Sequence, residues 1–318
     1  MITREKIINS LYPIVASPKH VFIDLEKIKE ISKKFLSVQV PPWNNELQFV
    51  GIPEETMQYY FFLDSINFCF WAPKGEERWQ YKIGDEWVSG YYAYSKAIKD
   101  AFVKDRRFFD AEYLSNISKQ DFETVFTGRN ILLLLDERLA IIRENFKILK
   151  DKFDGQAINI LKQAENDTDK FVELILENFP SFRDIVEKDG VTYNFLKRVQ
   201  IFPSDLSFTG IDNLKLSNLN HLTVFADYKL PQILEAFGVL KYSDELNFNI
   251  VNEDLIEKGS QKEMELRASS IIAIEKMHEE IIQLGRNITT NELDWILWVE
   301  AKATKFAKPH HKTLTTFY

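Results

Sequence analysis

Apolar residues recur at intervals of three and four along most of this sequence, and this spacing is its strongest constraint on the fold. The spacing is typical of amphipathic α-helices, which bury one face and expose the other. Thr3, Asp24 and Ser118 each stand directly before such a stretch and are predicted to cap helices. A largely buried aromatic stretch is expected at 54–70, and helices are expected at 91–103, 118–126, 132–152, 157–165, 168–179, 193–202, 231–240, 262–284 and 290–305. The predicted fold class is therefore mostly α.

One short stretch departs from the helical spacing. Residues 79–83 and 86–88 flank Gly84 and Asp85, a pattern that predicts a small β-hairpin at 79–88. With only 11 Gly and 10 Pro in 318 residues, the chain has no flexible linker that would separate domains. Residues 1–318 are therefore expected to form a single compact domain.

Composition argues against several classes of protein. The formal net charge is −8 and no basic stripe stands out, whereas a polynucleotide-binding protein needs a basic face. No apolar stretch approaches the roughly 18 residues of a membrane span, and the charged N-terminus is not followed by the apolar segment of a secretion signal. The single cysteine, Cys69, lies in an apolar run, which is typical of a buried thiol in a cytoplasmic protein.

Several kinds of catalytic chemistry lack their motifs. The sequence contains no GxGxxG, Walker A, HExxH, CxxC or GxSxG pattern. Of the five histidines, only His310 and His311 are close in sequence, so neither a metal site nor a cofactor is expected. Carboxylate chemistry in an aromatic setting is what remains.

Asp227 is the most prominent carboxylate, within TVFADYKLPQIL at 223–234. It precedes a predicted helix that has Pro231 near its start, and apolar residues surround it on both sides. On this pattern alone, Asp227 is either a helix cap or a catalytic carboxylate.

Two further acidic residues lie among aromatic side chains. Asp64 is in an apolar run with Asn67, where a carboxylate needs partners, so it is either part of a buried network or part of a site. Asp294 lies one helical turn before Trp298 and directly before Trp295. That helix either buries its tryptophans in the core or presents a carboxylate and indoles to a flat heterocycle.

Eight motifs, in order, resemble one family. They are FxxDSINFCFW ending at residue 71, WVSGYYAY at 87–94, ENFPSFRD at 177–184, FLKRVQIF at 195–202, TVFADYKLPQIL at 223–234, LKYSDEL at 240–246, ELDWILW at 292–298 and PHHKTLTTFY at 309–318. Together they are similar to the queuosine salvage proteins, the queuosine 5′-phosphate N-glycosylase/hydrolases. The resemblance covers the chain from about Lys19 to Tyr318.

The resemblance implies a helical fold similar to that of helix-hairpin-helix DNA glycosylases. It also implies hydrolysis of the N-glycosidic bond of queuosine 5′-monophosphate, which releases the 7-deazaguanine base queuine. The family's catalytic Asp falls on Asp227, and its base-contacting Phe on Phe225. The Asp–aromatic pair that lines the base pocket falls on Asp294 and Trp295.

Two positions depart from the family's pattern. Other members carry an acidic residue directly after the LW pair, where this chain has Val299 followed by Glu300. They also carry a His after the early Trp, where this chain has Asn45. Glu300 and Asn45 are therefore candidates for contacts with the base's side group, and a related 7-deazapurine nucleotide is an open alternative substrate.

The 5′-phosphate of such a substrate requires hydrogen-bond donors. Lys197, Arg198 and Arg267 are the leading candidates, followed by Lys229 and His311, although each is also consistent with a surface role. Tyr228 is a candidate donor to the sugar or the phosphate. Asp227 would stabilise an oxocarbenium-like transition state directly, by covalent attack or by activating water.

Two other functions are consistent with these residues. One is a base-excision glycosylase that acts on a nucleic acid, and the other is a non-catalytic protein that binds a 7-deazapurine. The preferred prediction is an N-glycosyl hydrolase with a small nucleotide as its partner, without direct binding to nucleic acid or membrane. No oligomeric state follows from the sequence.

Overall fold

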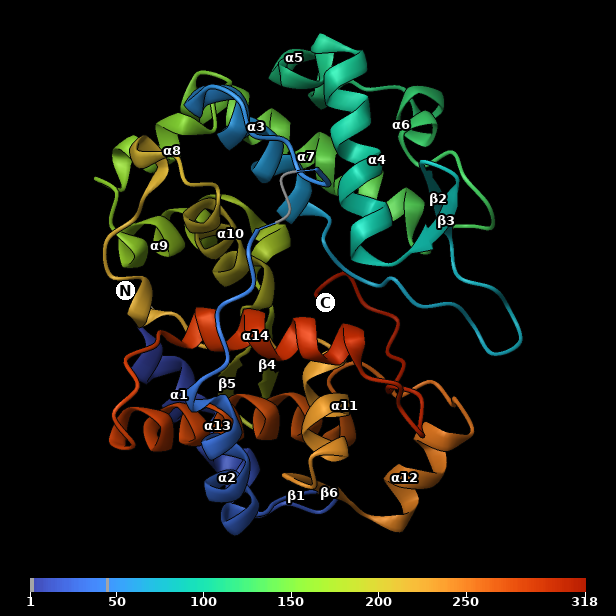
Figure 1. The fold of residues 1–318 in the computed structure, drawn as a ribbon. Coiled ribbons are helices and arrows are strands. Elements are labelled where there is room, and N and C mark those ends of the chain that lie inside the picture. Colours follow the sequence, from blue (N-terminus) through green and yellow to red (C-terminus); the bar gives the residue numbers. More distant parts are fainter. Residues whose placement is uncertain (1–2, 44–45) are drawn as a thin grey trace.

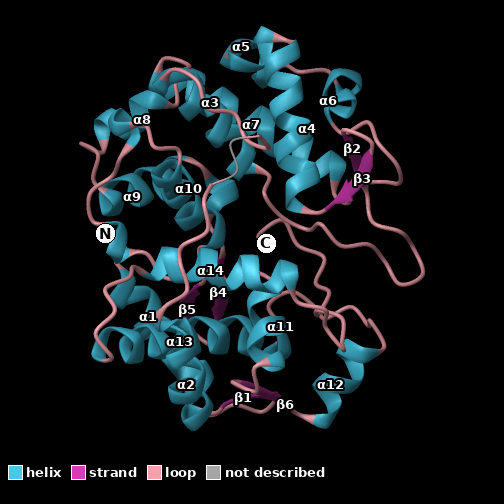
Figure 2. Cartoon of the chain, viewed as in Figure 1, coloured by secondary structure: helices cyan, strands magenta, loops and turns pink. Residues whose placement is uncertain are grey.

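The computed structural model describes residues 3–43 and 46–318. Helices make up most of this chain, and the few strands are short (Figure 2). The α-helices are α1 (Arg4–Ala16), α2 (Leu25–Ser32), α3 (Pro53–Ser65), α4 (Tyr91–Lys104), α5 (Ala111–Ser115), α6 (Lys119–Val125), α7 (Leu135–Phe153), α8 (Ile158–Gln163), α9 (Thr168–Asn178), α10 (Lys197–Phe208), α11 (Lys229–Ala236), α12 (Asp244–Val251), α13 (Gln261–Gln283) and α14 (Thr290–Ala303). The mostly α fold class is confirmed, whereas the likeness to helix-hairpin-helix glycosylases and the single domain stay predictions.

The strands pair two by two into small antiparallel sheets. They are β1 (Val21–Ile23) with β6 (Leu240–Tyr242), β2 (Gln80–Ile83) with β3 (Glu86–Ser89), and β4 (Ile185–Lys188) with β5 (Val191–Asn194). The predicted hairpin at 79–88 is β2–β3, in which Ile83 pairs with Glu86. Gly84 in its turn has a φ of 59°, a left-handed conformation that glycine adopts without strain.

Local capping rules account for where several helices begin. The side chain of Thr3 accepts a hydrogen bond from the backbone of Lys6 at 3.3 Å, and that of Asp24 accepts one from Lys27 at 3.0 Å. Each bond pairs an N–H group that has no partner within its own helix. Ser118 accepts from the backbone of Asp121 in the same way, so these predicted starts are confirmed.

One of the sequence-based helix boundaries fails near the pocket described below. Residues 193 and 194, predicted as helix, belong to β5, and α10 begins only at Lys197. The aromatic stretch at 54–70 is largely buried, as predicted, and its helical part, α3, ends at Ser65. Its last residues form an irregular segment whose carbonyl groups bind side chains rather than the next helical turn.

Helix α14 lies across the middle of the molecule, between α3, α4, α7 and α10 on one side and α1, α2, α11 and α13 on the other (Figure 1). It packs directly against α11 and α13. The C-terminal segment also runs through this central region, where the carbonyl of Tyr318 accepts a hydrogen bond from the backbone of Cys69 at 2.9 Å. Among the residues that the structure describes, no helix combines the length and apolar character needed to cross a membrane.

Candidate active site

A pocket of about 910 Å³, counting its open mouth, lies where α10, α11 and α14 meet. Other parts of the chain also contribute to its lining, namely Asn67, Phe68 and Phe70 after α3, Gly90 and Tyr91 at the start of α4, Trp43, Arg78 and Tyr318. The pocket brings together side chains that are far apart in the sequence, and it contains most of the predicted site residues.

Asp227 lies in this pocket, half-buried, just before α11. Its Oδ1 accepts hydrogen bonds from the backbone N–H groups of Lys229 at 2.7 Å and Leu230 at 3.2 Å. The helix cap and the pocket carboxylate, alternatives on sequence grounds, are thus the same group. Because both bonds use Oδ1, the other carboxylate oxygen is available to a ligand, as far as the described residues go.

Lys197, the first residue of α10, is the buried cation whose charge acts most strongly on Asp227. Burial raises the pKa of Asp227, but the charge of Lys197 and the two backbone hydrogen bonds oppose this shift. Burial conversely lowers the pKa of Lys197, and the charge of Asp227 opposes that shift. The Nζ of Lys197 donates to the carbonyl of Asn67 at 2.9 Å. Each group therefore favours the charged form of the other.

Two more carboxyl groups face the pocket and favour their protonated forms. Burial raises the pKa of Asp294 to about 8, and its Oδ1 accepts a hydrogen bond from the backbone of Phe225 at 2.9 Å. Burial also raises the pKa of Asp205 well above its usual range, and this group accepts from the hydroxyl of Tyr91 at 3.2 Å. Neutral carboxyl groups of this kind can both donate and accept hydrogen bonds.

Asp64 does not line the pocket and lies behind it. It is fully buried and accepts a hydrogen bond from the side chain of Asn67 at 3.2 Å. Burial raises the pKa of Asp64 to about 7. Of the two interpretations of this carboxylate, the buried network is the one that the contacts support.

The segment between Ser65 and Cys69 is held by three buried cations. Arg198 donates to the carbonyl of Ser65, and Lys197 donates to that of Asn67. Arg138 donates to the remaining carbonyls, those of Ile66, Phe68 and Cys69. Burial raises the pKa of the Cys69 thiol to about 11, which fits the predicted buried cysteine.

Aromatic side chains form one wall of the pocket. The rings of Trp43 and Phe208 stack with centroids 5.2 Å apart at 10°, and those of Trp295 and Trp298 stack at 5.4 Å and 11°. Trp295 also donates from Nε1 to the carbonyl of Pro41 at 3.0 Å, which fixes the orientation of its ring. Flat indole faces beside buried carboxyl groups suit a planar heterocycle that is stacked and hydrogen-bonded at its edge.

Three cations lie on the solvent side of the lining: Arg78, Lys229 and Lys302. Burial and the charge of Arg78 together lower the pKa of Lys229 to about 8. Burial and Arg78 also lower the pKa of Lys302. Arg78 donates to Nε2 of His310 at 3.3 Å, and the His310 ring stacks on Tyr228. Because these cations repel one another, an anion placed among them would be stabilised.

Some of the site residues predicted from the sequence line the pocket, and others do not. Those that line the pocket are Lys197, Phe225, Asp227, Tyr228, Lys229, Asp294 and Trp295, whereas His311 is buried outside the lining. Asn45 lies outside the described residues. Glu300 is exposed and is not part of the lining, because it points away from the face of α14 that Asp294 and Trp298 share. Its contact with the side group of the base therefore stays a prediction that the lining does not support.

Arg198 and Arg267 are corrected, since neither lines the pocket and each is 1% exposed. Arg198 donates to the backbone carbonyls of Ser65 and Ser181, and Arg267 pairs with Asp184. From the sequence, each arginine was either a phosphate donor or a solvated surface residue, and its burial fits neither interpretation. Both guanidinium groups are buried in the interior and make these bonds away from the pocket lining.

Sequence reasoning also missed part of the site. Lys302 lies one helical turn after Trp298, so the spacing along α14 could have indicated it. Arg78 lies in an irregular stretch before β2, and no local pattern marks it. Asp205 was also missed, because its place within α10 resembles that of an ordinary polar helix residue.

A helical fold with a pocket carboxylate, an aromatic wall and a cationic mouth is typical of proteins that bind a flat, anionic small molecule. The model of the family described as "Queuosine salvage protein" matches residues 47–318, and the chain belongs to this family. The resemblance expected from the sequence motifs is thereby confirmed.

Relatives with one shared name match along most of the chain. The "Queuosine 5'-phosphate N-glycosylase/hydrolase" of Sphaerobacter thermophilus is 34% identical over 310 residues, covering 96% of this chain and 95% of that protein. The protein of this name from Mus musculus is 30% identical over 325 residues, covering 96% of each. That from Dictyostelium discoideum is 34% identical over 268 residues, covering 83% of this chain and 79% of the relative.

Proposed function

We propose that this protein hydrolyses the N-glycosidic bond of queuosine 5′-monophosphate and releases the base queuine. The observation that carries the proposal is that Asp227 shares one pocket with a neutral carboxyl group beside stacked indoles and with a group of cations. These three parts match the sugar, the base and the phosphate of such a nucleotide. The names of the relatives support the same substrate and reaction.

Asp227 is proposed as the catalytic carboxylate. Cleavage of a glycosidic bond develops positive charge on the sugar, and a nearby carboxylate stabilises that charge. The oxygen of Asp227 that is not bound to the start of α11 is available for this role, for covalent attack or for orienting water. Lys197 assists by favouring the ionised form of Asp227.

The base is proposed to stack on the wall that contains Trp295. A 7-deazaguanine has no N7 to protonate, so its departure relies on hydrogen bonds along the edge of the ring. Asp294 can accept from the N1–H and exocyclic amine, and these donors would favour its ionised form. Asp205, as a neutral acid in the same lining, can donate to an acceptor on the ring or its side group.

The phosphate is proposed to bind among Arg78, Lys229 and Lys302, in place of Arg198 and Arg267. Their charges converge on one part of the lining, and Lys229 is adjacent to Tyr228, which offers a hydroxyl. Arg78 supplies a planar fork of donors that suits phosphate oxygens, whereas the two lysines act as point charges.

Incubation of the purified protein with queuosine 5′-monophosphate, queuosine and guanosine monophosphate, followed by chromatography for free base, tests this proposal. Release of queuine from the 5′-monophosphate, faster than from queuosine, is expected. Tight binding without release would favour a non-catalytic 7-deazapurine-binding protein. Release of base only from an oligonucleotide would favour a nucleic-acid glycosylase and overturn the proposal.

A further inference from the structure

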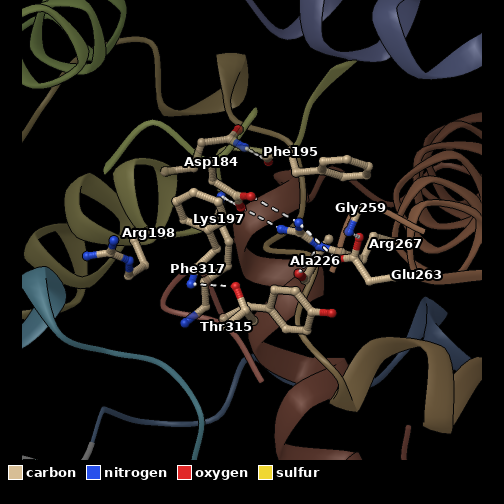
Figure 3. A network of polar contacts seen from close by, with 12 residues as sticks. Asp184, Phe195, Lys197, Arg198, Ala226, Gly259, Glu263, Arg267, Thr315 and Phe317 are labelled. Carbon is tan, nitrogen blue, oxygen red and sulfur yellow. Dashed lines mark hydrogen bonds and ion pairs between the residues drawn. The ribbon is translucent and has the colours of Figure 1, made fainter. Parts of the chain in front are cut away.

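Arg267 forms hydrogen bonds to two segments of the chain that lie near the pocket. It projects from α13, is 1% exposed, and directs its guanidinium toward Asp184 and Ala226 (Figure 3). Its Nη1 and Nη2 donate to the two carboxylate oxygens of Asp184 at 2.9 and 2.5 Å. Its Nε donates to the carbonyl of Ala226 at 3.2 Å. One rigid group therefore bonds to two different parts of the chain.

Asp184 in turn fixes the start of α10. Its Oδ2 accepts a hydrogen bond from the backbone N–H of Lys197 at 3.1 Å. Its own carbonyl accepts from the backbone of Phe195 and of Leu196, each at 3.1 Å. Leu196 has a left-handed φ of 54°, a conformation that such a residue adopts only when its surroundings hold it. The hydrogen bonds to the carboxylate and carbonyl of Asp184 thus fix the position of Lys197 at the start of α10.

Ala226, the second partner of Arg267, is the residue directly before Asp227. The guanidinium is therefore bonded to the neighbour of the proposed catalytic carboxylate and, through Asp184, to the residue whose charge acts on that carboxylate. We propose that Arg267 is a positioning residue that sets the placement of Lys197 relative to Asp227. This inference rests on the proposed function, because it assigns a role relative to the catalytic group.

The surroundings of Arg267 explain why an arginine suits this position. Its guanidinium lies 4.2 Å from the Phe195 ring centroid and 4.3 Å from that of Tyr318, and Glu263 offers a second carboxylate at 3.4 Å. Burial opposes the charge, but Asp184 and Glu263 outweigh it and raise the pKa of Arg267. A lysine could hold one of these partners, but it lacks the planar fork that reaches both Asp184 and Ala226.

The test compares Arg267→Lys and Asp184→Asn with a matched control, Glu265→Gln. Glu265 lies on the same helix, is fully buried and accepts hydrogen bonds from backbone N–H groups at 19–21, away from the pocket lining. Both test substitutions keep some hydrogen-bonding capacity. They therefore avoid the unpaired buried carboxylates that Arg267→Met would leave and that could prevent folding.

The expected result is a fall in kcat of about 10- to 100-fold for Arg267→Lys and Asp184→Asn, with KM changed less than about threefold. The acid limb of the kcat–pH profile should also move to higher pH, because a displaced Lys197 favours ionised Asp227 less. Lys229, Tyr228 and Asp294 also face Asp227, but none of them bonds to Arg267 in the structure. Glu265→Gln should keep the parent's kcat and pH profile at equal folded fraction.

Two outcomes would overturn the inference. One is parent-like kcat and an unmoved acid limb in both test variants, and the other is an equal loss in Glu265→Gln. Asp227→Asn, measured alongside, separates this inference from the proposed function. An inactive Asp227→Asn beside fully active Arg267→Lys and Asp184→Asn would reject only the positioning role. A fully active Asp227→Asn would reject the catalytic role on which the inference rests.

Discussion

Asp294 accepts a hydrogen bond from the backbone N–H of Phe225 at 2.9 Å, which joins α14 to the segment that carries Asp227. The same carboxyl group lines the pocket. Asp294 therefore has a structural partner on one oxygen and a second oxygen available for a base. These two roles can be separated, because an asparagine retains one oxygen and replaces the other with an amide donor.

Asp294→Asn is expected to fold normally but to lose preference for a deazaguanine over a deazaadenine nucleotide. The amide cannot accept from the N1–H of the guanine-like edge, while its oxygen still accepts from Phe225. The ratio of kcat/KM for the two nucleotides measures the effect, and a fall of about 10-fold or more is expected. Asp294→Ala should show the same loss of selectivity together with lower stability. Unchanged selectivity in both variants would mean that another group recognises the base.

Asp227→Asn is expected to bind the nucleotide nearly as well as the parent but to lose at least about 100-fold in kcat. Its amide oxygen can still accept from Lys229 and Leu230, so α11 should remain capped. Calorimetric titration gives the affinity, single-turnover kinetics give the rate, and the melting temperature serves as the control. Equal rates in variant and parent would remove Asp227 from the mechanism.

Lys229→Met and Lys302→Met are expected to raise KM for the 5′-monophosphate while leaving the slower reaction of the unphosphorylated nucleoside nearly unchanged. A lost phosphate contact affects only the substrate that carries the phosphate. The measurement is kcat/KM for nucleotide and nucleoside in each variant. Lys305→Met, an exposed position outside the lining, is the matched control. A similar loss for both substrates would place the phosphate elsewhere.

The stability of the protein is expected to depend on pH through Asp294. Its folded pKa of about 8 lies above the usual value of about 3.8, so the folded state binds the proton more tightly. The stability that protonated Asp294 contributes to the folded state is fully present below about pH 4 and is lost as the pH rises towards 8. The unfolding free energy of Asp294→Asn minus that of the parent should therefore increase with rising pH, by on the order of a few kcal/mol. This difference should level off above about pH 8.

Urea unfolding of both proteins at several pH values between 5 and 9 measures this difference. Asp64 and Asp205 titrate in both proteins, so their contributions largely cancel in the comparison. A difference in unfolding free energy that stays constant across this range would contradict the elevated pKa of Asp294.

Local sequence rules predicted the parts of the fold that depend on neighbouring residues. Thr3, Asp24 and Ser118 cap helices because each side chain bonds to a backbone group three residues further on. The turn at Gly84 is local in the same sense. Asp227 and Asp294 could be placed in one site only because the family motifs imply it, since their helices are separated in the sequence.

The failed predictions depend on partners that are remote in the sequence. Arg198 is buried because it reaches the carbonyls of Ser65 and Ser181, and Arg267 because Asp184 lies opposite it. No spacing rule connects those residues. Residues 193 and 194 were predicted as helix because their pairing with β4 is not apparent from an apolar spacing.

The hydrogen bonds to the carbonyl groups from Ser65 to Cys69 affect the free energy of ligand binding. Each of these carbonyl groups is bound by Arg138, Lys197 or Arg198, all of which are buried. This side of the pocket therefore loses its conformational entropy when the chain folds, before any ligand arrives. A ligand that enters gives up little of its binding free energy to order that wall, so its affinity reports mainly on the contacts it makes.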